Sequence, residues 1–213
     1  METVFVTVYR ALLVVLVVAV AVPPVAQVAA GPAPSLFPLV AGAVWTRKSD
    51  EGTESVTKVV GPKTVGTVRC VVAERKAVER GRERIDRTCY QVTAAEILII
   101  EWTSPRGGLT LSKPARPLMK LPPKAGQTWS WSPADSAFEM KITSKWIGEE
   151  TVKVAAGTYK AWKLQTVTAG EDTEITAYTW YAPGVGAVRS ERKGYRGDTQ
   201  ISGWSELVSY KAP

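Results

Sequence analysis

Few residues in this sequence have the types and spacing that catalysis needs. Ser55 and Lys58 form a Ser-x-x-Lys pattern, which in some hydrolases places a nucleophile beside its partner. That chemistry requires a strand-to-helix turn and further motifs, whereas the flanking residues here are β-branched and strand-like. Acidic pairs at residues 149–150 and 171–172 lie in expected turns, where carboxylates are usually solvated. A hydrolase of envelope polymers built on two carboxylates stays open as an alternative.

Histidine is absent from the chain. Its absence removes the commonest general base, the usual ligand at transition-metal sites and every Ser-His or Cys-His nucleophile. Gly184 and Gly186 lack the following helix and lysine of a phosphate-binding loop. We therefore predict that the protein is not an enzyme and has no catalytic residue, metal site or cofactor.

Eight tryptophans are many for 213 residues. They could form an aromatic platform for carbohydrate or lipid, or they could fill the core of a β-sheet protein. The candidates for ligand contact are Trp45, Trp129, Trp162 and Trp180. Because Trp45 and Trp129 lie in a repeated turn motif, core packing is the favoured interpretation.

A charged segment, residues 69–87, carries seven basic and four acidic side chains. Its arginines could bind anionic headgroups or phosphates. The alternative is a solvated, ion-paired sheet edge that discourages aggregation between sheets. The interleaved acids favour this second interpretation, because exposed pairs largely cancel the field.

The residue types along the chain indicate strands in most of its segments. Segments rich in Val, Ile, Thr, Trp and Tyr, broken by Gly, Pro and Asp, cover residues 53–60, 64–74, 96–103, 138–147, 158–168, 173–182 and 199–210. This pattern predicts an all-β fold of antiparallel sheet, either a curved half-barrel or a sandwich.

Several landmarks occur twice in the same order. The pattern Pro-x-x-Ala-Gly-x-x-Trp covers residues 38–45 and returns 84 residues later, at 122–129. A Gly-x-x-Thr-Val pattern recurs at an offset of 87, and Gly-Thr and Tyr landmarks recur at 91. We interpret these matches as two duplicated halves, residues 37–118 and 119–213, which share one core. In the first motif, glycine can take a positive φ before a strand begins.

Residues 71–88 are ambiguous between a helix and a hairpin. Val71, Val78 and Ile85 recur every seven residues, and the composition favours helix. The offset of 91, however, aligns residues 78–81 with an evident turn at 169–172. Gly81 inside a helix would also cost about 1 kcal/mol. We therefore favour a hairpin with its tip near residues 80–81.

Cys70 and Cys89 provide a test of the hairpin. They lie at equal distances from residues 79–80, so a hairpin would place them directly opposite, within reach of a disulfide. In a helix their Cα atoms would be about 28 Å apart. We predict the disulfide, worth about 3 kcal/mol in the chain-entropy model. The aligned residues in the second half, Ala161 and Trp180, would form a packing pair instead.

The N-terminus resembles an export signal. Residues 11–22 are an uninterrupted apolar run, preceded by Arg10 and followed by small residues at 28–30. We expect a signal peptide over residues 1–30 and a linker over 31–36, hence a periplasmic or extracellular protein. The run is too short to span a bilayer unaided, but an uncleaved anchor in the inner membrane stays an alternative.

Composition fits a folded domain with a basic surface. The chain is 45% apolar and 22% charged, and its formal net charge is +7. That charge suits an anionic lipid or an envelope polysaccharide as partner, and no specific nucleic-acid binding is expected.

Two motifs resemble a group of exported bacterial proteins that form a domain family of unknown function. Those proteins carry Val-Pro-Ala-Gly-Thr-Phe-x-Ala followed by Trp-Tyr-Ala-Pro-Gly-Val-Gly-x-Val. The corresponding segments here are residues 154–161 and 180–188, with Ala155 and Tyr159 in place of the usual Pro and Phe. The resemblance implies an antiparallel β architecture and an envelope or secreted location, and it brings no catalytic residues.

These observations lead to one leading hypothesis, a non-catalytic binding or structural module of the bacterial envelope. The first alternative is a periplasmic carrier of lipid or another apolar ligand. The hydrolase considered above is the second.

Overall fold

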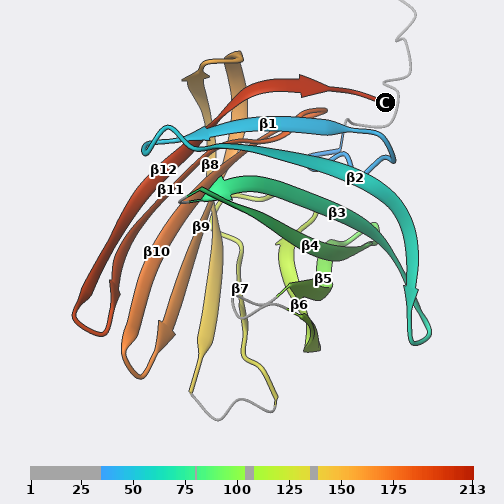
Figure 1. Ribbon diagram of the computed structural model, residues 1–213. Helices are drawn as coiled ribbons and strands as arrows, with labels where there is room; N and C mark the ends of the chain where they lie inside the picture. Colours follow the sequence, from blue (N-terminus) through green and yellow to red (C-terminus); the bar gives the residue numbers. More distant parts are fainter. Residues whose placement is uncertain (1–34, 80, 104–107, 135–138) are drawn as a thin grey trace, which may run out of the picture. The chain divides into compact units, whose positions relative to one another are not determined.

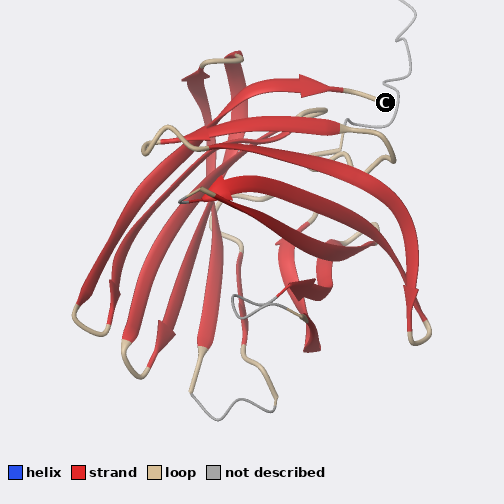
Figure 2. Ribbon diagram, in the orientation of Figure 1, coloured by secondary structure: helices blue, strands red, loops and turns tan. Residues whose placement is uncertain are grey.

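The computed structural model describes residues 35–79, 81–103, 108–134 and 139–213. Within these ranges the chain consists of strands and loops, without a helix (Figure 2). The first six strands are β1 (Val44–Ser49), β2 (Glu54–Val65), β3 (Val68–Glu79), β4 (Arg82–Val92), β5 (Glu96–Thr103) and β6 (Leu109–Lys120). The other six are β7 (Thr128–Trp131), β8 (Lys141–Val154), β9 (Gly157–Gly170), β10 (Thr173–Ala182), β11 (Gly186–Arg196) and β12 (Thr199–Lys211).

All twelve strands belong to one antiparallel sheet, in the order β6-β5-β4-β3-β2-β1-β12-β11-β10-β9-β8-β7. The sheet curls until it is nearly closed into a barrel (Figure 1). The prediction of an all-β, antiparallel and curved architecture is thus confirmed, and a single curled sheet takes the place of a two-sheet sandwich.

The sheet order contains two meanders of six strands, β1–β6 and β7–β12, joined where β1 pairs with β12. Matched local geometry recurs in both. Gly42 (φ +93°) donates its N–H to the carbonyl of Val59 at 2.9 Å, and Gly126 (φ +83°) does the same to Trp146 at 2.8 Å. Each acceptor strand then shifts register, after Val59 in β2 and after Trp146 in β8. The boundaries proposed for the two halves stay a prediction.

Residues 71–88 form a hairpin, not a helix. Glu79 pairs with Arg82 at the end of the β3–β4 ladder, and Gly81 takes a φ of +75° in the two-residue loop. The β9–β10 hairpin ends in the same way, with Gly170 paired to Thr173, 91 residues further along each strand. The hairpin lies between β2 and β5 in the sheet order, so it is not an end of the sheet. Among the described residues, however, β4 pairs with β5 only from Thr88 to Val92, and its residues before Thr88 pair with β3 alone, so this part of the hairpin is a sheet edge as predicted.

The disulfide Cys70–Cys89 is present, with a Cα–Cα distance of 5.7 Å. The prediction that the two cysteines are directly opposite was wrong, because the loop lies one residue further along than expected. Cys89 pairs with Val72, so the disulfide joins diagonal neighbours on one face of the ladder. A twisted sheet brings such neighbours within bonding reach.

The buried apolar side chains form three clusters. The first contains Trp45, Val59, Trp180 and Leu207 among others, and the second contains Ile97, Met119, Trp129, Trp146 and Tyr181 among others. A third, smaller cluster surrounds Cys70, Cys89 and Ile100. Trp180 and Tyr181 are adjacent in β10 but belong to different clusters, since neighbouring side chains of a strand face opposite sides.

The two ends of the sheet, β6 and β7, meet along a seam that side chains bridge. Three indole N–H groups donate to carbonyls of β6: Trp129 to Pro117 (3.3 Å), Trp131 to Pro114 (2.8 Å) and Trp146 to Lys120 (2.9 Å). Proline has no N–H, so β6 cannot donate at positions 114 and 117 to a regular ladder. The tryptophans therefore supply the donors that bring the sheet close to closure.

Candidate binding site

A cavity of about 960 Å³ lies on the face toward which the sheet curls. Its lining comes from β1, β2, β3, β4, β10, β11 and β12 and from the β1–β2 turn. Strands so far apart in the sheet order can border one cavity only on the concave side. Pockets of about 300–1,000 Å³ are typical of small-molecule sites.

The lining of this cavity is charged and hydroxylated. Its charged members are Arg47, Asp50, Glu51, Arg75, Glu79, Arg82, Glu191 and Arg192. Its hydroxyl groups belong to Ser49, Thr53, Ser55, Ser190, Ser202 and Ser205. Trp204, about 40% exposed, provides an aromatic ring at the same cavity. Such a lining offers many hydrogen bonds and little continuous apolar surface.

Most carboxylates of the lining already have partners. Glu79 pairs with Arg75 (3.3 Å), and Glu191 accepts from Arg189 (2.7 Å). Asp50 accepts the backbone N–H groups of Glu51 and Trp204, at 3.1 and 3.3 Å, which fixes the turn after β1. These carboxylates therefore hold the walls of the cavity in place.

Arg47 differs from these carboxylates, because both of its hydrogen-bond partners are neutral. It lies half-buried in β1 and donates to the carbonyl of Ala187 (2.5 Å) and to Ser190 Oγ (3.4 Å). Across the described ranges, no carboxylate oxygen lies within 4.0 Å of its guanidinium. Burial lowers the pKa of Arg47; the Tyr181 phenol acts in the opposite sense, and the charge of Arg75 lowers the pKa further.

A second, smaller pocket of about 210 Å³ adjoins the cavity, because Arg47 and Arg75 line both. Apart from Thr57, Asp86 and Thr88, the rest of its lining is apolar or aromatic: Phe37, Trp45, Ala73, Tyr90 and Ala187. Phe37 packs edge-on against Tyr90, with ring centroids 5.4 Å apart, and against Tyr181 at 6.2 Å. We call this space the inner pocket.

Two tyrosines that are equivalent at the offset of 91, Tyr90 and Tyr181, flank Phe37 in this way. Burial raises the pKa of both phenols, because it disfavours the phenolate. Burial likewise lowers the pKa of Arg116 in β6, which Tyr90 and Tyr181 partly offset. Both phenols are therefore neutral at ordinary pH.

The four tryptophans proposed as ligand contacts do not form one platform. Trp45 is buried, donates its indole N–H to the carbonyl of Val185 (2.5 Å) and lines the inner pocket. Trp129 belongs to the seam, and Trp162 packs edge-on against Trp146 at 6.2 Å. Trp180 lies under Lys163, whose Nζ is 4.6 Å from the ring centroid. Ligand contact therefore stays a prediction for all four, and Trp45 borders the inner pocket.

Sequence reasoning missed Arg47 and Trp204. Trp45, Arg47 and Ser49 alternate along β1 and so share one face, which is a pattern visible in the sequence. Trp204 was among the eight tryptophans but lies outside the repeated motif. Its place at the cavity depends on the pairing of β12 with β11, which no local pattern reveals.

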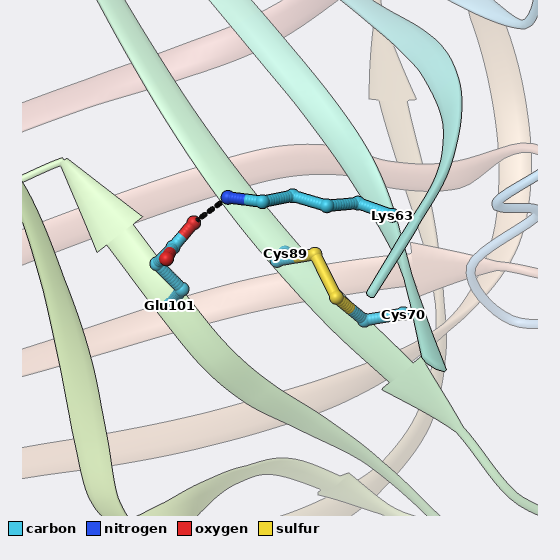
Figure 3. The surroundings of a disulfide bond; sticks show 4 residues. All are labelled: Lys63, Cys70, Cys89 and Glu101. Atoms are coloured by element: carbon cyan, nitrogen blue, oxygen red, sulfur yellow. Dashed lines mark hydrogen bonds and ion pairs between the residues drawn. A yellow bond between two sulfur atoms is a disulfide. The ribbon is translucent and has the colours of Figure 1, made fainter. Parts of the chain in front are cut away.

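The charged hairpin and the disulfide occupy neighbouring parts of the sheet. The tip of the hairpin contributes Glu79 and Arg82 to the cavity. Figure 3 shows Lys63 extending past the disulfide to form an ion pair with Glu101, on the face that bears the two cysteines. The disulfide thus braces β3 and β4 away from the cavity.

Two further searches concern the described residues alone. No cluster of three or more His, Cys, Asp or Glu side chains there is arranged to hold a metal ion. The same residues contain no helix with the length and apolar character needed to cross a membrane. The expected signal peptide, residues 1–30, and most of the expected linker lie outside the described ranges.

Comparison with known proteins gives a family likeness for the second half of the chain. A family model described as DUF3108-like matches residues 120–207, which is less than half of the chain. The chain is thus similar to that family over β8–β11 and their surroundings, and the particular signature described above stays a prediction. No curated protein matches the sequence.

Two solved structures have a related shape. One, a "putative lipoprotein" from Parabacteroides distasonis, is 16% identical with a TM-score of 0.48, and the match covers 85% of this chain and all of that chain. The other, a "putative exported protein" with a YmcC-like fold from Bacteroides fragilis, is 16% identical with a TM-score of 0.46. This second match covers 84% of this chain and all of that chain.

Proposed function

We propose that the protein is an exported, non-catalytic binding protein whose concave sheet face holds a polar small molecule. The observation that carries the proposal is the cavity of about 960 Å³, lined by charged and hydroxyl groups from six strands and the β1–β2 turn. A structural role alone would not require a curled sheet to leave so large a polar space open.

The nature of the lining supports a polar ligand over a lipid chain. A carrier of lipid chains needs a continuous apolar cleft, but the aromatic side chains here pack mostly against one another in the two large clusters. The inner pocket, which has the more apolar lining, holds about 210 Å³. The geometry therefore supports a ligand that is mainly polar.

Export is supported by two independent features. The apolar run at residues 11–22 has the length of a signal peptide. The Cys70–Cys89 disulfide, with both cysteines buried, is typical of proteins that fold in an oxidising compartment. A periplasmic or extracellular location is part of the proposal, as is a partner that is anionic, whether a lipid headgroup or an envelope polysaccharide.

The proposal that the protein is not an enzyme rests on how three of the four carboxylates that line the cavity are used. Glu79 and Glu191 are held by arginines, and the Asp50 carboxylate caps backbone N–H groups. General acid catalysis needs a carboxyl group that is free to transfer a proton to substrate. Groups committed to such pairs act as structural supports.

The test is a comparison of two tryptophan variants. Ser205 lies on the concave face and lines the cavity, whereas Ser209 is exposed on the same strand and does not. A panel of polar small molecules, both charged and neutral, is screened by thermal shift and calorimetry against the wild type, Ser205→Trp and Ser209→Trp. A ligand of the cavity stabilises the wild type and Ser209→Trp but not Ser205→Trp, by the linkage of binding to folding. The proposal would be refuted if every ligand found binds all three proteins equally, so that the Ser205→Trp change blocks none of them.

A further inference from the structure

Arg47 and Arg75 occupy the boundary between the polar cavity and the inner pocket, and they differ in one respect. Arg75 is neutralised within the fold, by Asp86 at 3.1 Å and Glu79 at 3.3 Å. Arg47 has two neutral acceptors, a carbonyl and a hydroxyl, and no carboxylate partner among the described residues. Of the two guanidinium groups, that of Arg47 is therefore the one whose positive charge is not balanced by a carboxylate.

A cation held in this way is costly, because burial removes water without supplying a counter-charge. The groups that face Arg47 from neighbouring strands make the position more positive. Arg75 of β3 repels it, the phenol of Tyr181 in β10 is neutral, and Asp86 of β4 is engaged by Arg75. An anion placed beside Arg47 would supply the missing charge and form charge-assisted hydrogen bonds.

The inner pocket defines what the anion is attached to. Its walls are formed mainly by Phe37, Trp45, Ala73 and Tyr90, so it favours an apolar group. At about 210 Å³ it exceeds the cavity of about 150 Å³ that is known to accept benzene. It therefore has room for a short chain or a single ring, and it is too small for the tails of a membrane lipid.

We propose that Arg47 anchors an organic anion, a carboxylate or phosphate attached to a short apolar group that enters the inner pocket. This inference rests on the proposed binding function and specifies the ligand class. The head group lies in the polar cavity against Arg47 and Ser190 Oγ. The apolar group lies between Phe37, Trp45 and Tyr90.

The first experiment uses the wild-type protein and four probes in isothermal titration calorimetry. Octanoate and octyl phosphate carry both parts of the proposed ligand, octan-1-ol lacks the charge, and acetate lacks the chain. Octanoate or octyl phosphate binds at least about tenfold more tightly than octan-1-ol and acetate, the factor expected for a charge-assisted hydrogen bond. The tighter of the two identifies the head group. Equal binding of octan-1-ol would overturn the role of the anion, and equal binding of acetate would overturn the role of the inner pocket.

The second experiment changes the protein. Arg47→Gln weakens binding of the preferred anion by about tenfold or more relative to its effect on octan-1-ol. The matched control is Arg87→Gln, which removes an exposed arginine paired with Glu74 and outside both cavities, and which leaves binding unchanged. Circular dichroism and thermal melts establish that each variant is folded.

A further variant keeps the inference testable if Arg47→Gln does not fold. Thr57 lines the inner pocket but not the large cavity, so Thr57→Leu narrows the inner pocket and leaves Arg47 in place. It weakens octanoate relative to acetate by at least about tenfold, since each buried methylene contributes substantially to transfer from water. Unchanged selectivity would overturn the inference.

The failures of the two proposals are distinguishable. If a neutral polar compound binds and Ser205→Trp blocks it, while neither octanoate nor octyl phosphate binds, the ligand class is wrong and the binding function stands. If Ser205→Trp blocks no compound in the panel or among these probes, both proposals fail.

Discussion

Removal of the Cys70–Cys89 disulfide is the perturbation whose size follows most directly from the structure. The two cysteines are separated by 19 positions, so the bond closes a loop of about 20 residues in the unfolded chain. The chain-entropy relation gives about 3 kcal/mol for a loop of this length at 25 °C. Both side chains are about 2% exposed, so alanine leaves only small voids in the third cluster. We therefore expect the Cys70→Ala/Cys89→Ala protein to lose about 3 kcal/mol of unfolding free energy.

The assay is guanidinium denaturation of the double variant, the oxidised wild type and the reduced wild type. The reduced wild type is the matched control, because it loses the crosslink without any change of sequence. Both uncrosslinked proteins have lower midpoints, and hydrogen exchange quickens first in β3 and β4, which the bond joins. A double variant within about 0.5 kcal/mol of the oxidised wild type, or a reduced wild type of unchanged midpoint, would show that the loop-entropy reasoning does not apply here.

Three other predictions test the seam, the buried phenols and one close backbone contact. Trp146→Phe removes a buried indole donor and leaves a β6 carbonyl without its partner, which should cost about 2 kcal/mol in urea unfolding; a neutral result would refute the bridging role. Because burial raises the pKa of Tyr181, the folded state keeps its proton above pH 10 while the unfolded state releases it, so stability falls as pH rises. Tyr181→Phe should reduce that fall, measured from pH 8 to 11.5, by up to about 1.4 kcal/mol per pH unit, and an unchanged slope would contradict the assignment. Gly194→Ala would place a Cβ 2.0 Å from a β10 carbonyl oxygen and should cost about 3 kcal/mol in denaturant unfolding. Gly148→Ala, at a similar φ but in open space, is the control and should cost about 1 kcal/mol; equal losses would refute the steric argument.

The sequence was most informative where local pattern and repetition agreed. β10 matches the predicted segment 173–182, because most of its residues are β-branched or aromatic. The hairpin of β3 and β4 was predicted against its own helical composition, since the offset of 91 aligned it with a turn. The repeat between the two halves of the sequence therefore predicted a structure that the local residue propensities did not.

Two other strands have a local composition that does not predict a strand. β11 contains Arg189, Glu191, Arg192, Lys193 and Arg196, so its composition resembles a solvated loop, yet it pairs with β10 and β12 along most of its length. β6 contains two prolines, which a central strand would exclude and an end strand tolerates. Pairing with neighbours determines both strands, and a single sequence does not encode that pairing locally.

The residues that line the cavity could not be predicted from the sequence, for a related reason. Arg47 of β1 and Arg75 of β3 become neighbours through the ladders β1–β2 and β2–β3. Arg47 and Ser190 of β11 meet only because β1 pairs with β12, which closes a loop of more than 140 residues. Types and spacings identify charged residues, but curvature decides which of them face one another.

The seam between β6 and β7 also determines where the nearly closed sheet can widen. Every other boundary between adjacent strands is a backbone ladder, whereas the described residues bridge this one by three indole N–H groups and by one backbone bond, from Ala134 to Lys113 at 2.7 Å. Widening the ring there breaks no backbone ladder between the described strands. The cavity lies around the β1–β12 pair, in the middle of the strand order and therefore farthest along the sheet from the seam. We expect the wall that lines the cavity to stay rigid, while the opposite side opens and closes to adjust the enclosed volume.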